Sequence, residues 1–425
     1  MKARRLEQRV VVTGMGAVTA LGLSVDETWA GLVAGRSGIA TITRFDTSDL
    51  PIHIAGEVKG FDPTDYIGLE QVRRMPRCTH LALAAATQAM ADAGLEDGVP
   101  NPERAGVVMG AANGGIEVST EGWEAFKAEG RAGLSPFMFS AMLPSNPAYQ
   151  TAQHCRCQGY SSTITTACAS GTQAIGEAVE AIRRGAADLV LGGGAESMIH
   201  PAFFIGLYAL RVLAGDNEHP ERAIKPFDAR RDGFARAEGA AILVLERLDH
   251  ALQRGARIYA EVLGYAANSD AHHVAIPDPV GAGAGRCIRL TLQNAGISPA
   301  DVDYINAHGP ATEVGDRTET MAIKAEFGEH AYRVPVSSTK SMVGHASGAA
   351  GAIEAMVCVK SIAEGIIHPT INYEVPDPDC DLDYVPNVAR RADVRVALSN
   401  SFGLGGQNAC LVMGRYEAGE GGTPV

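Results

Sequence analysis

The chain has 425 residues, of which 46% are hydrophobic and 20% charged, and its formal net charge is −13. Such a composition suits a globular protein with a sizeable core, and the acidic balance argues against a general nucleic-acid binder, which would usually be basic. No apolar run reaches the roughly 20 residues needed to cross a bilayer, and no signal-peptide core follows the basic N-terminus, so we expect a cytoplasmic protein that binds neither membrane nor nucleic acid.

Short apolar runs alternate along the chain with Ala-rich stretches of helical periodicity. This alternation predicts an α/β protein in which helices cover largely parallel or mixed sheets. The predicted strands cover residues 10–13, 105–109, 162–166, 189–191, 241–245, 259–263, 302–305 and 396–398. The predicted helices cover residues 81–94, 172–185, 318–327 and 352–365.

A Gly-rich segment, Gly14-Met15-Gly16, follows the first predicted strand and resembles the start of a dinucleotide-binding fingerprint. The third fingerprint position holds Thr19, and Asp26 comes too soon to bind a ribose. We therefore predict a tight turn with close packing at this segment.

Two halves are expected, residues 1–256 and residues 257–425, because the strand at 241–245 closes one run of elements and the strand at 259–263 opens another. Neither a literal repeat nor a Pro/Ser-rich linker separates them, so we expect one shared core. The Gly-rich tail, residues 417–425, is predicted to lack regular structure.

Eight scattered cysteines predict reduced thiols in a cytosolic protein. Cys155 and Cys157, close to His154, are the sole cluster, and no second ligand pair accompanies them. We therefore predict no metal site.

Cys168 lies between a β-branched run and an Ala-rich helix, at a strand-to-helix turn. Free N–H groups at a helix N-terminus favour a thiolate, so this position predicts a nucleophile with a depressed pKa. A small buried core residue is the alternative, since free cysteines are commonly buried.

Two histidines occupy Gly-flanked positions later in the chain. His308 ends the predicted strand at 302–305, where ligands commonly bind in α/β sheets. His345 precedes an apolar helix that contains Glu354, and Lys340 comes five residues before His345. A carboxylate in an apolar helix is usually paired, and Lys340 is the natural partner. A purely structural Lys–Glu pair is the alternative.

The segment Asn400-Ser401-Phe402-Gly403-Leu404-Gly405-Gly406-Gln407-Asn408 is rich in glycine. Glycines let a backbone approach another group closely, and free N–H groups in such a loop can form an oxyanion hole.

Taken in order, these motifs resemble the beta-ketoacyl-acyl-carrier-protein synthase II family of thiolase-like condensing enzymes, from Arg9 to about Gly414. Further points of likeness are the segments 11–16, 192–196, 226–228 and 231–234. The resemblance implies a thiolase-like fold, with two similar αβαβα halves forming one layered core, and a homodimer without a cofactor.

The resemblance also implies roles for residues. Cys168 takes an acyl group from acyl carrier protein as a thioester, and His308 and His345 bind the malonyl thioester and assist its decarboxylation. Lys340 and Glu354 maintain the electrostatics of the site. Further implied roles are an oxyanion hole from the N–H groups of Cys168 and Leu404, a gate at Phe402 and Leu404, and contact of Thr312 with the substrate arm.

Carrier-protein docking is implied for Arg73, Arg74 and Arg211, with Arg77 and Arg131 as nearby candidates. Both partners are acidic, so a local basic patch has to overcome their repulsion. Ordinary solvated arginines are the alternative.

Several positions depart from the family pattern. Pro310 and Ala311 follow His308-Gly309 where the family has Thr and Ser, Leu404 replaces a Phe, Gln407 replaces a Thr, and Ala237 replaces a Gly. These departures suggest a specialised relative.

Three alternatives to fatty-acid elongation stay open. The first is a ketosynthase of a type II polyketide or polyene pathway. The second is a non-catalytic chain-length partner subunit, against which Cys168 and both histidines argue. The third is a degradative thiolase with Cys410 as its base, although Cys410 lies beyond the expected position.

Overall fold

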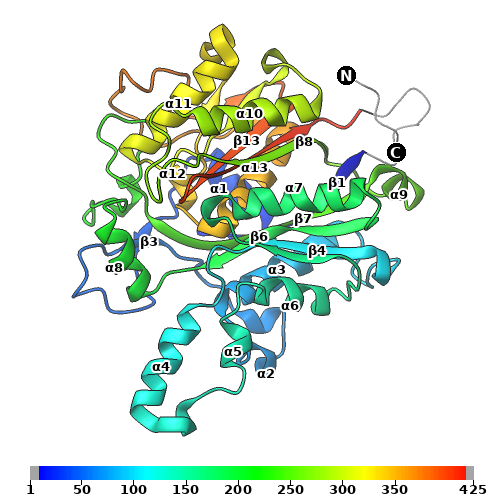
Figure 1. Cartoon of the computed structure of the whole chain (residues 1–425), viewed down its shortest axis with the longest axis vertical. Helices are drawn as coiled ribbons and strands as arrows, with labels where there is room; N and C mark the ends of the chain where they lie inside the picture. The colour runs from blue at the N-terminus through cyan, green and yellow to red at the C-terminus, as the bar shows by residue number, and fades with distance from the viewer. Residues whose placement is uncertain (1–8, 418–425) are drawn as a thin grey trace.

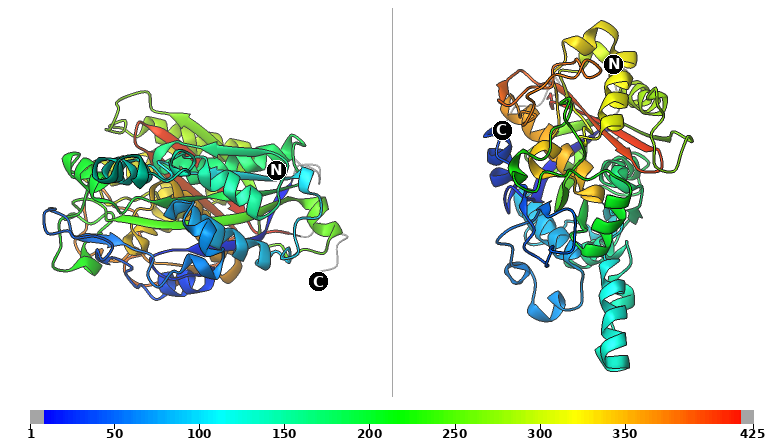
Figure 2. Two further views of the ribbon diagram at one scale, coloured as in Figure 1. Left: turned by 90° about the horizontal axis from the view of Figure 1, so that it is seen from below. Right: turned by 90° about the vertical axis from the view of Figure 1, so that its left-hand side faces the viewer.

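A computed structural model describes residues 9–417 as five layers, in which three layers of helices alternate with two layers of sheet (Figure 1; Figure 2). Residues 418–425 of the predicted irregular tail lie outside the described part. Among the helices of residues 9–417, none combines the length and apolar character that crossing a bilayer requires.

The two halves repeat one sheet topology. In the first half, the strands lie in the order β1 (Val10–Val18), β7 (Arg236–Arg247), β6 (Leu189–Ser197), β4 (Ala105–Gly110), β5 (Ser161–Ile164). In the second, the order is β8 (Ala260–Ser269), β14 (Gln407–Gly414), β13 (Val396–Gly403), β9 (Tyr304–Asn306), β10 (Val336–Ser337). In each half, the strands that come first, fifth, fourth, second and third in the sequence therefore lie side by side in that order. The two similar halves expected from the resemblance are therefore confirmed.

Antiparallel pairing of β1 with β8 joins the two sheets, at Val11–Glu261 and Val12–Ala260. The outer layers hold α3 (Arg77–Asp92) and α6 (Asn146–His154) on one side, and α10 (Ala282–Ala295) and α11 (Glu313–Phe327) on the other. The central layer holds α7 (Ser170–Arg183) and α13 (Ala350–Glu364).

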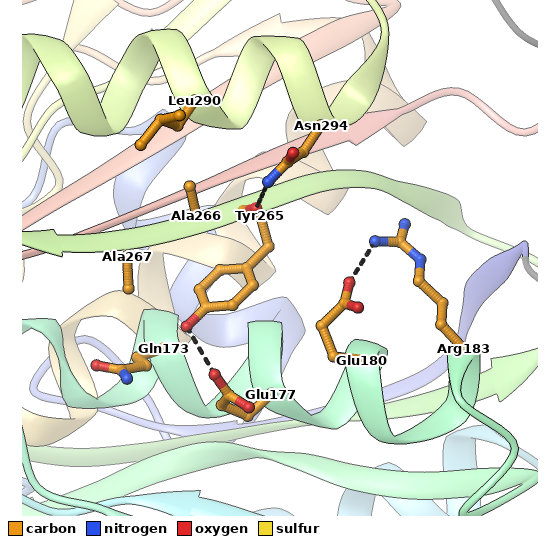
Figure 3. Close-up of a pocket in the computed structure, with 9 residues that line it drawn as sticks. All are labelled: Gln173, Glu177, Glu180, Arg183, Tyr265, Ala266, Ala267, Leu290 and Asn294. Atoms are coloured by element: carbon orange, nitrogen blue, oxygen red, sulfur yellow. Dashed lines mark hydrogen bonds and ion pairs between the residues drawn. The ribbon is translucent and has the colours of Figure 1, made fainter.

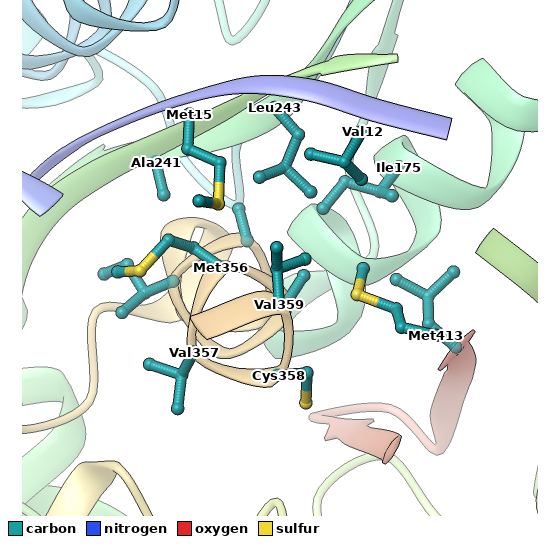
Figure 4. Packing of buried hydrophobic residues seen from close by; sticks show 14 of the residues in the cluster. Val12, Met15, Ile175, Ala241, Leu243, Met356, Val357, Cys358, Val359 and Met413 are labelled. Atoms are coloured by element: carbon teal, nitrogen blue, oxygen red, sulfur yellow. The ribbon is translucent and has the colours of Figure 1, made fainter. Parts of the chain in front are cut away.

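Helix α13 occupies the middle of the core because its sequence is apolar on nearly every side, which is typical of a buried helix. Met356 and Val359 pack against strand residues of the first sheet, while Met413 comes from the second (Figure 4). The core therefore spans both halves, as expected.

Smaller elements complete the fold. The remaining helices are α1 (Val25–Val33), α2 (Leu69–Val72), α4 (Glu117–Glu129), α5 (Met138–Ala141), α8 (Pro201–Ala209), α9 (Leu248–Gln253) and α12 (Lys340–Val343). The short strands are β2 (Ala40–Thr41), β3 (Ile54–Gly56), β11 (Ile366–Ile367) and β12 (Arg390–Arg391).

Every predicted strand and helix is present, but several extend beyond the predicted bounds. The prediction of a turn at Gly14–Gly16 is wrong, because both glycines lie inside β1. The predicted close packing is confirmed: a Cβ at Gly14 would be 2.5 Å from the Ala89 carbonyl oxygen, and one at Gly16 would overlap that of Ala85. The glycines let α3 lie directly on the strand.

The two central helices begin in the same way. Ala167, with φ of 50°, and Ser347, with φ of 46°, are non-glycine residues in the left-handed region. Each opens a short 3₁₀ turn, Ala167–Ala169 before α7 and Ser347–Ala349 before α13. Such conformations cost free energy and cluster at functional sites.

Gly171 and Gly351 allow these helices to cross at close range. A Cβ at Gly171 would lie 2.8 Å from the Ala352 nitrogen, and one at Gly351 would overlap the Thr172 hydroxyl. We predict that Gly351→Ala lowers the free energy of unfolding by about 3 kcal/mol, since overpacking a tight core forces neighbours apart. Thermal and urea unfolding would measure the change.

Gly206→Ala in α8 is the matched control, because a Cβ there has no heavy atom within 4 Å. The unfolding midpoint of Gly206→Ala should equal that of the wild type or lie slightly above it, as expected for alanine in a helix. Equal midpoints for the two variants would contradict the close crossing.

Candidate active site

Cys168 lies at the turn between β5 and α7, at the centre of the molecule. The Ser170 hydroxyl shapes this turn by donating to the Ala167 carbonyl at 2.7 Å and accepting from the Thr166 N–H at 2.8 Å. The Cys168 side chain remains half-buried. The turn therefore presents a thiol at the start of a buried helix.

His345 faces this thiol from the second half of the chain, with Nε2 at 3.0 Å from the Cys168 sulfur. Its Nδ1 accepts the Ser347 N–H at 3.2 Å, so the imidazole proton lies on Nε2 and points toward the sulfur. The backbone of His345 also pairs with the start of β7, through Ala235 and Ala237. Both halves of the chain thus fix its position.

His308 completes the group, with its ring centroid 5.6 Å from that of His345. Buried Glu319, on α11, holds the His308 turn by accepting the N–H groups of His308 at 2.9 Å and Gly309 at 2.8 Å. Asn400 donates to the same carboxylate at 3.1 Å. These hydrogen bonds fix the backbone turn that carries the His308 imidazole.

Lys340 and Glu354 form the expected pair, fully buried, with Nζ and Oε1 2.5 Å apart. The Lys340 ammonium also donates to the His308 carbonyl oxygen at 2.6 Å. Burial raises the pKa of Glu354 to about 7, against the opposing effect of the Lys340 charge. The pair thus acts on the His308 turn directly.

Both imidazoles are neutral at physiological pH. Burial lowers the pKa of His308 and of His345 well below the ordinary value, and the nearby Lys340 charge lowers both further. A neutral imidazole keeps one N–H donor, which can stabilise a developing oxyanion without a metal.

The expected depression of the Cys168 pKa is wrong. Burial raises the pKa of this thiol, and it outweighs the opposing effects of Arg236, the Leu404 N–H and Lys340. The position at a helix N-terminus was visible in the sequence, but the degree to which the fold buries the sulfur was not.

We therefore predict that alkylation of Cys168 by iodoacetamide accelerates by about tenfold per pH unit between about pH 6 and pH 8.5, because the thiolate fraction rises in this way below a raised pKa. Intact-mass kinetics would follow the reaction, with Cys168→Ala reporting alkylation of the other cysteines. A plateau already reached at pH 7 would contradict the raised pKa.

The Gly-rich turn after β13 lies against the nucleophile. A Cβ at Gly403 would be 2.7 Å from the Thr166 carbonyl oxygen, so glycine permits this approach. The Leu404 N–H donates to the Cys168 sulfur. The Phe402 ring lies 6.0 Å from that of His308, whereas the Leu404 side chain is 48% exposed. Of the two predicted gate residues, only Phe402 thus lies against a site histidine.

Comparison with known proteins agrees with this geometry. Residues 7–251 match the family model for the beta-ketoacyl synthase N-terminal domain, and residues 259–374 match that for the C-terminal domain. The chain belongs to the beta-ketoacyl synthase family. A 3-oxoacyl-[acyl-carrier-protein] synthase 2 of Synechocystis sp. is 45% identical over 97% of this chain and 99% of its own length. The protein of the same name from Coxiella burnetii is 42% identical over 96% and 99%.

Solved structures of beta-ketoacyl synthases also resemble this one. The ishigamide ketosynthase/chain length factor is 39% identical, with a TM-score of 0.90 over 98% of this chain and 100% of the other. A ketosynthase bound to a hexaketide, in complex with a type II polyketide acyl-carrier protein, is 36% identical, with a TM-score of 0.87 over 96% and 99%. The thiolase-like fold expected from the sequence is therefore confirmed.

Thr312 has a structural task in this beta-ketoacyl synthase. Its hydroxyl accepts the Gly315 N–H at 3.2 Å and caps the N-terminus of α11. Its contact with a substrate arm stays a prediction.

The arginines predicted to dock a carrier protein lie on two elements. Arg73 and Arg74 directly follow α2, and Arg74 pairs with Glu70 and lies 4.7 Å from the Phe137 ring. Arg211 is exposed beyond α8. The Arg77 guanidinium pairs with buried Glu238 at 2.7 Å, and a part for Arg77 in docking stays a prediction.

Other cysteines lie apart from this chemistry. Cys410 is fully buried in β14, within a hydrophobic cluster of the second half, so it does not occupy a base position of the degradative thiolase alternative. Within residues 9–417, no group of three or more His, Cys, Asp or Glu side chains is arranged to hold a metal.

A surface groove of about 810 Å³ lies between α7, β8 and α10 (Figure 3). Tyr265 crosses it and donates to Glu177 at 3.1 Å, while Glu180 pairs with Arg183. None of the predicted catalytic residues lines this groove.

Sequence reasoning missed three residues of the site. Glu319 supports His308, the Phe234 ring lies 4.8 Å from that of His345, and buried Arg236 lies near Cys168. A usable signal existed for Glu319, because helical periodicity places it on the buried face of α11 with Ala322 and Ile323.

Proposed function

We propose that the chain is a 3-oxoacyl-acyl-carrier-protein synthase that extends an acyl chain by two carbons in fatty-acid biosynthesis. The observation that carries this proposal is a thiol 3.0 Å from the His345 imidazole, whose ring centroid lies 5.6 Å from that of a second imidazole, His308, both from the other half of the chain. Relatives that bear this name over nearly their full length support the substrate class.

The first half-reaction is acyl transfer. The Cys168 sulfur loses its proton and attacks the carbonyl carbon of the acyl thioester, so that the new C–S bond forms and the bond to the carrier sulfur breaks. The departing carrier thiolate takes up the proton that the Cys168 thiol gave up, and leaves as the thiol. The charge on the tetrahedral oxygen is stabilised by the N–H groups of Cys168 and Leu404, in the manner of an oxyanion hole.

The second half-reaction is decarboxylative condensation. The bond from the malonyl methylene carbon to its carboxylate breaks, CO₂ leaves, and the electron pair of that bond forms an enolate. The enolate oxygen accepts hydrogen bonds from the N–H groups of His308 and His345. The enolate carbon attacks the acyl carbonyl, and the tetrahedral intermediate collapses by expelling the Cys168 thiolate. Lys340 and Glu354 keep the His308 turn in position through the His308 carbonyl.

A ketosynthase of a type II polyketide or polyene pathway is the second candidate. The ketosynthase solved with its type II polyketide acyl-carrier protein is 36% identical to this chain, and the ishigamide ketosynthase/chain length factor is 39% identical. The departures at Pro310, Leu404 and Gln407 also favour a specialised relative. The condensation reaction is the same in both cases, so the two candidates differ in the acyl group and in the carrier protein. Cys168 and both histidines argue against a non-catalytic chain-length partner.

Acyl carrier protein is the proposed partner, with Arg73, Arg74 and Arg211 as docking residues. A solved relative is described as a ketosynthase in complex with its acyl-carrier protein, which supports this partner class. A catalytic thiol requires reducing conditions, and all eight cysteines are free, which supports a cytoplasmic location.

A homodimer is proposed from the surface. Helix α4 projects from the body (Figure 1; Figure 2). Together with the segment up to α5, it exposes large apolar side chains. The most exposed are Trp123 at 58% and Phe139 at 74%. Strand β5 is also an edge strand of its sheet. Apolar patches and open edges of this kind mark association surfaces.

Intact-mass measurement after mixing with acyl-carrier proteins of varied chain length tests the proposed function. We expect a gain of one acyl group in the wild-type protein and none in Cys168→Ala. An acyl gain that persists in the alanine variant, or its absence from the wild type with every chain, would overturn the proposal. The preferred chain separates the fatty-acid and polyketide candidates.

A further inference from the structure

Arg236 is an unusual neighbour for the reactive sulfur. It opens β7, its side chain is almost fully buried at 3% exposure, and its backbone bridges to His345. Its charge is the largest of the effects that oppose the raised pKa of Cys168. A fixed cation therefore lies in the interior beside the thiol.

Arg236 lacks a suitable partner. A guanidinium offers five N–H donors, yet the sole side-chain partner of Arg236 within residues 9–417 is the sulfur of Met198, a weak acceptor. Its Nε is sealed from solvent without a hydrogen bond. No carboxylate of the described chain forms an ion pair with it.

Glu196 is the acid whose charge acts on Arg236, but its carboxylate is already engaged. It accepts backbone N–H groups from Ala112 at 2.7 Å, Gly114 at 3.2 Å and Gly348 at 3.3 Å. Burial of an unpaired cation is costly. This cost suggests that a bound molecule supplies the missing acceptor.

A second donor points the same way. The Asn113 amide nitrogen lies 2.8 Å from the same Met198 sulfur. Two polar side chains thus share one weak acceptor. The arrangement suits a stronger acceptor than sulfur, such as an oxygen atom.

The position of Arg236 indicates which substrate supplies that oxygen. His308, His345 and Lys340 come from the second half of the chain. Arg236 opens β7 of the first half, and Asn113 follows β4, which pairs with the strand β5 that leads to Cys168. Arg236 and Asn113 therefore belong to the same half as the thiol. That is the side of the acyl group on Cys168, because the histidines hold the malonyl unit in the proposed function.

We propose that Arg236 and Asn113 bind an oxygen atom of the acyl chain on Cys168, in a carbonyl, hydroxyl or carboxylate group. The enzyme then loads oxygenated chains in preference to plain alkyl chains. This inference rests on the proposed function, and it makes Arg236 a specificity-determining residue for the acyl substrate.

Loading of Cys168 from N-acetylcysteamine thioesters tests it without a carrier protein. The probes are hexanoyl, 3-hydroxyhexanoyl, 5-oxohexanoyl and adipoyl thioesters, and intact mass gives the rate for each. We expect at least one oxygenated chain to load about 10–100-fold faster than hexanoyl in the wild type, since a hydrogen bond to a charged group has this strength. Arg236→Met should bring the ratio close to one, and Arg236→Lys should restore part of it.

Two further variants keep the test decisive. Asn113→Leu should lower the same ratio, and it serves if Arg236→Met fails to fold. Arg289→Met, which removes an exposed arginine paired with Glu326 on the surface, should keep the wild-type ratio.

Four results would overturn the inference. A wild-type loading ratio of oxygenated to hexanoyl chains near one for every oxygenated chain excludes the preference. An unchanged ratio in both Arg236→Met and Asn113→Leu excludes these residues as the groups that bind the oxygen. Unchanged loading ratios with slower malonyl decarboxylation in Arg236→Met would assign the guanidinium to the malonyl carboxylate instead. A wild-type protein that loads no chain at all, hexanoyl included, would remove the proposed function together with the inference.

Discussion

Replacing His308 with alanine is expected to slow condensation by about a hundredfold or more, while acyl loading of Cys168 is the less affected step. The reason is that His308 supplies one of two N–H donors to the proposed enolate, and loss of one such donor typically costs about 10²–10³ in turnover. Its neutral state follows from burial and the Lys340 charge, which both lower its pKa. Release of CO₂ from malonyl-carrier protein and intact-mass loading would measure the two steps separately.

His345→Ala should impair both steps, because His345 contacts the sulfur as well as facing His308. His219→Ala, at an exposed histidine next to Asp216, is the matched control and should behave as the wild type. Equal loss of loading and condensation in His308→Ala would show that His308 serves the fold of the site rather than the enolate.

Breaking the Lys340–Glu354 pair is expected to cost about 3–5 kcal/mol of stability, because a single substitution leaves the other charge buried and unpaired. Lys340→Met leaves the Glu354 carboxylate without its partner, and Glu354→Leu leaves the Lys340 ammonium without its partner. Both side chains are at most 2% exposed, so water offers little compensation. Chemical unfolding of each variant would give the cost, and turnover would be measured alongside it.

The double variant Lys340→Met/Glu354→Leu separates structure from catalysis. Replacing both charges with apolar groups should restore much of the stability. Turnover should remain low, because the donor to the His308 carbonyl oxygen is still missing. Recovery of turnover together with stability would reduce the pair to a structural role.

The main outline of the site could be predicted from the sequence because its chemistry lies in local motifs. Cys168, His308 and His345 each follow a strand-like run, and the layered fold brings such strand ends together. The Lys340–Glu354 contact was predictable from burial alone, since a carboxylate in an apolar helix needs a partner.

Features that depend on tertiary surroundings could not be predicted in this way. The pKa of Cys168 depends on how completely water is excluded from its turn. The task of Arg77 depends on Glu238, 161 positions away in the chain. The glycines at 14 and 16 imply close approach in any setting, but only the pairing of β1 with β7 shows that they lie within a strand.

The pairing of β1 with both β7 and β8 has a consequence for synthesis of the protein on the ribosome. The first residues of β1 pair with residues near 247 and 261, which are synthesised much later. Helix α13, which fills the space between the two sheets, is synthesised later still. Until then the nascent chain carries uncovered apolar helix faces and strand edges. We expect it to depend on chaperones until nearly the whole chain has been translated.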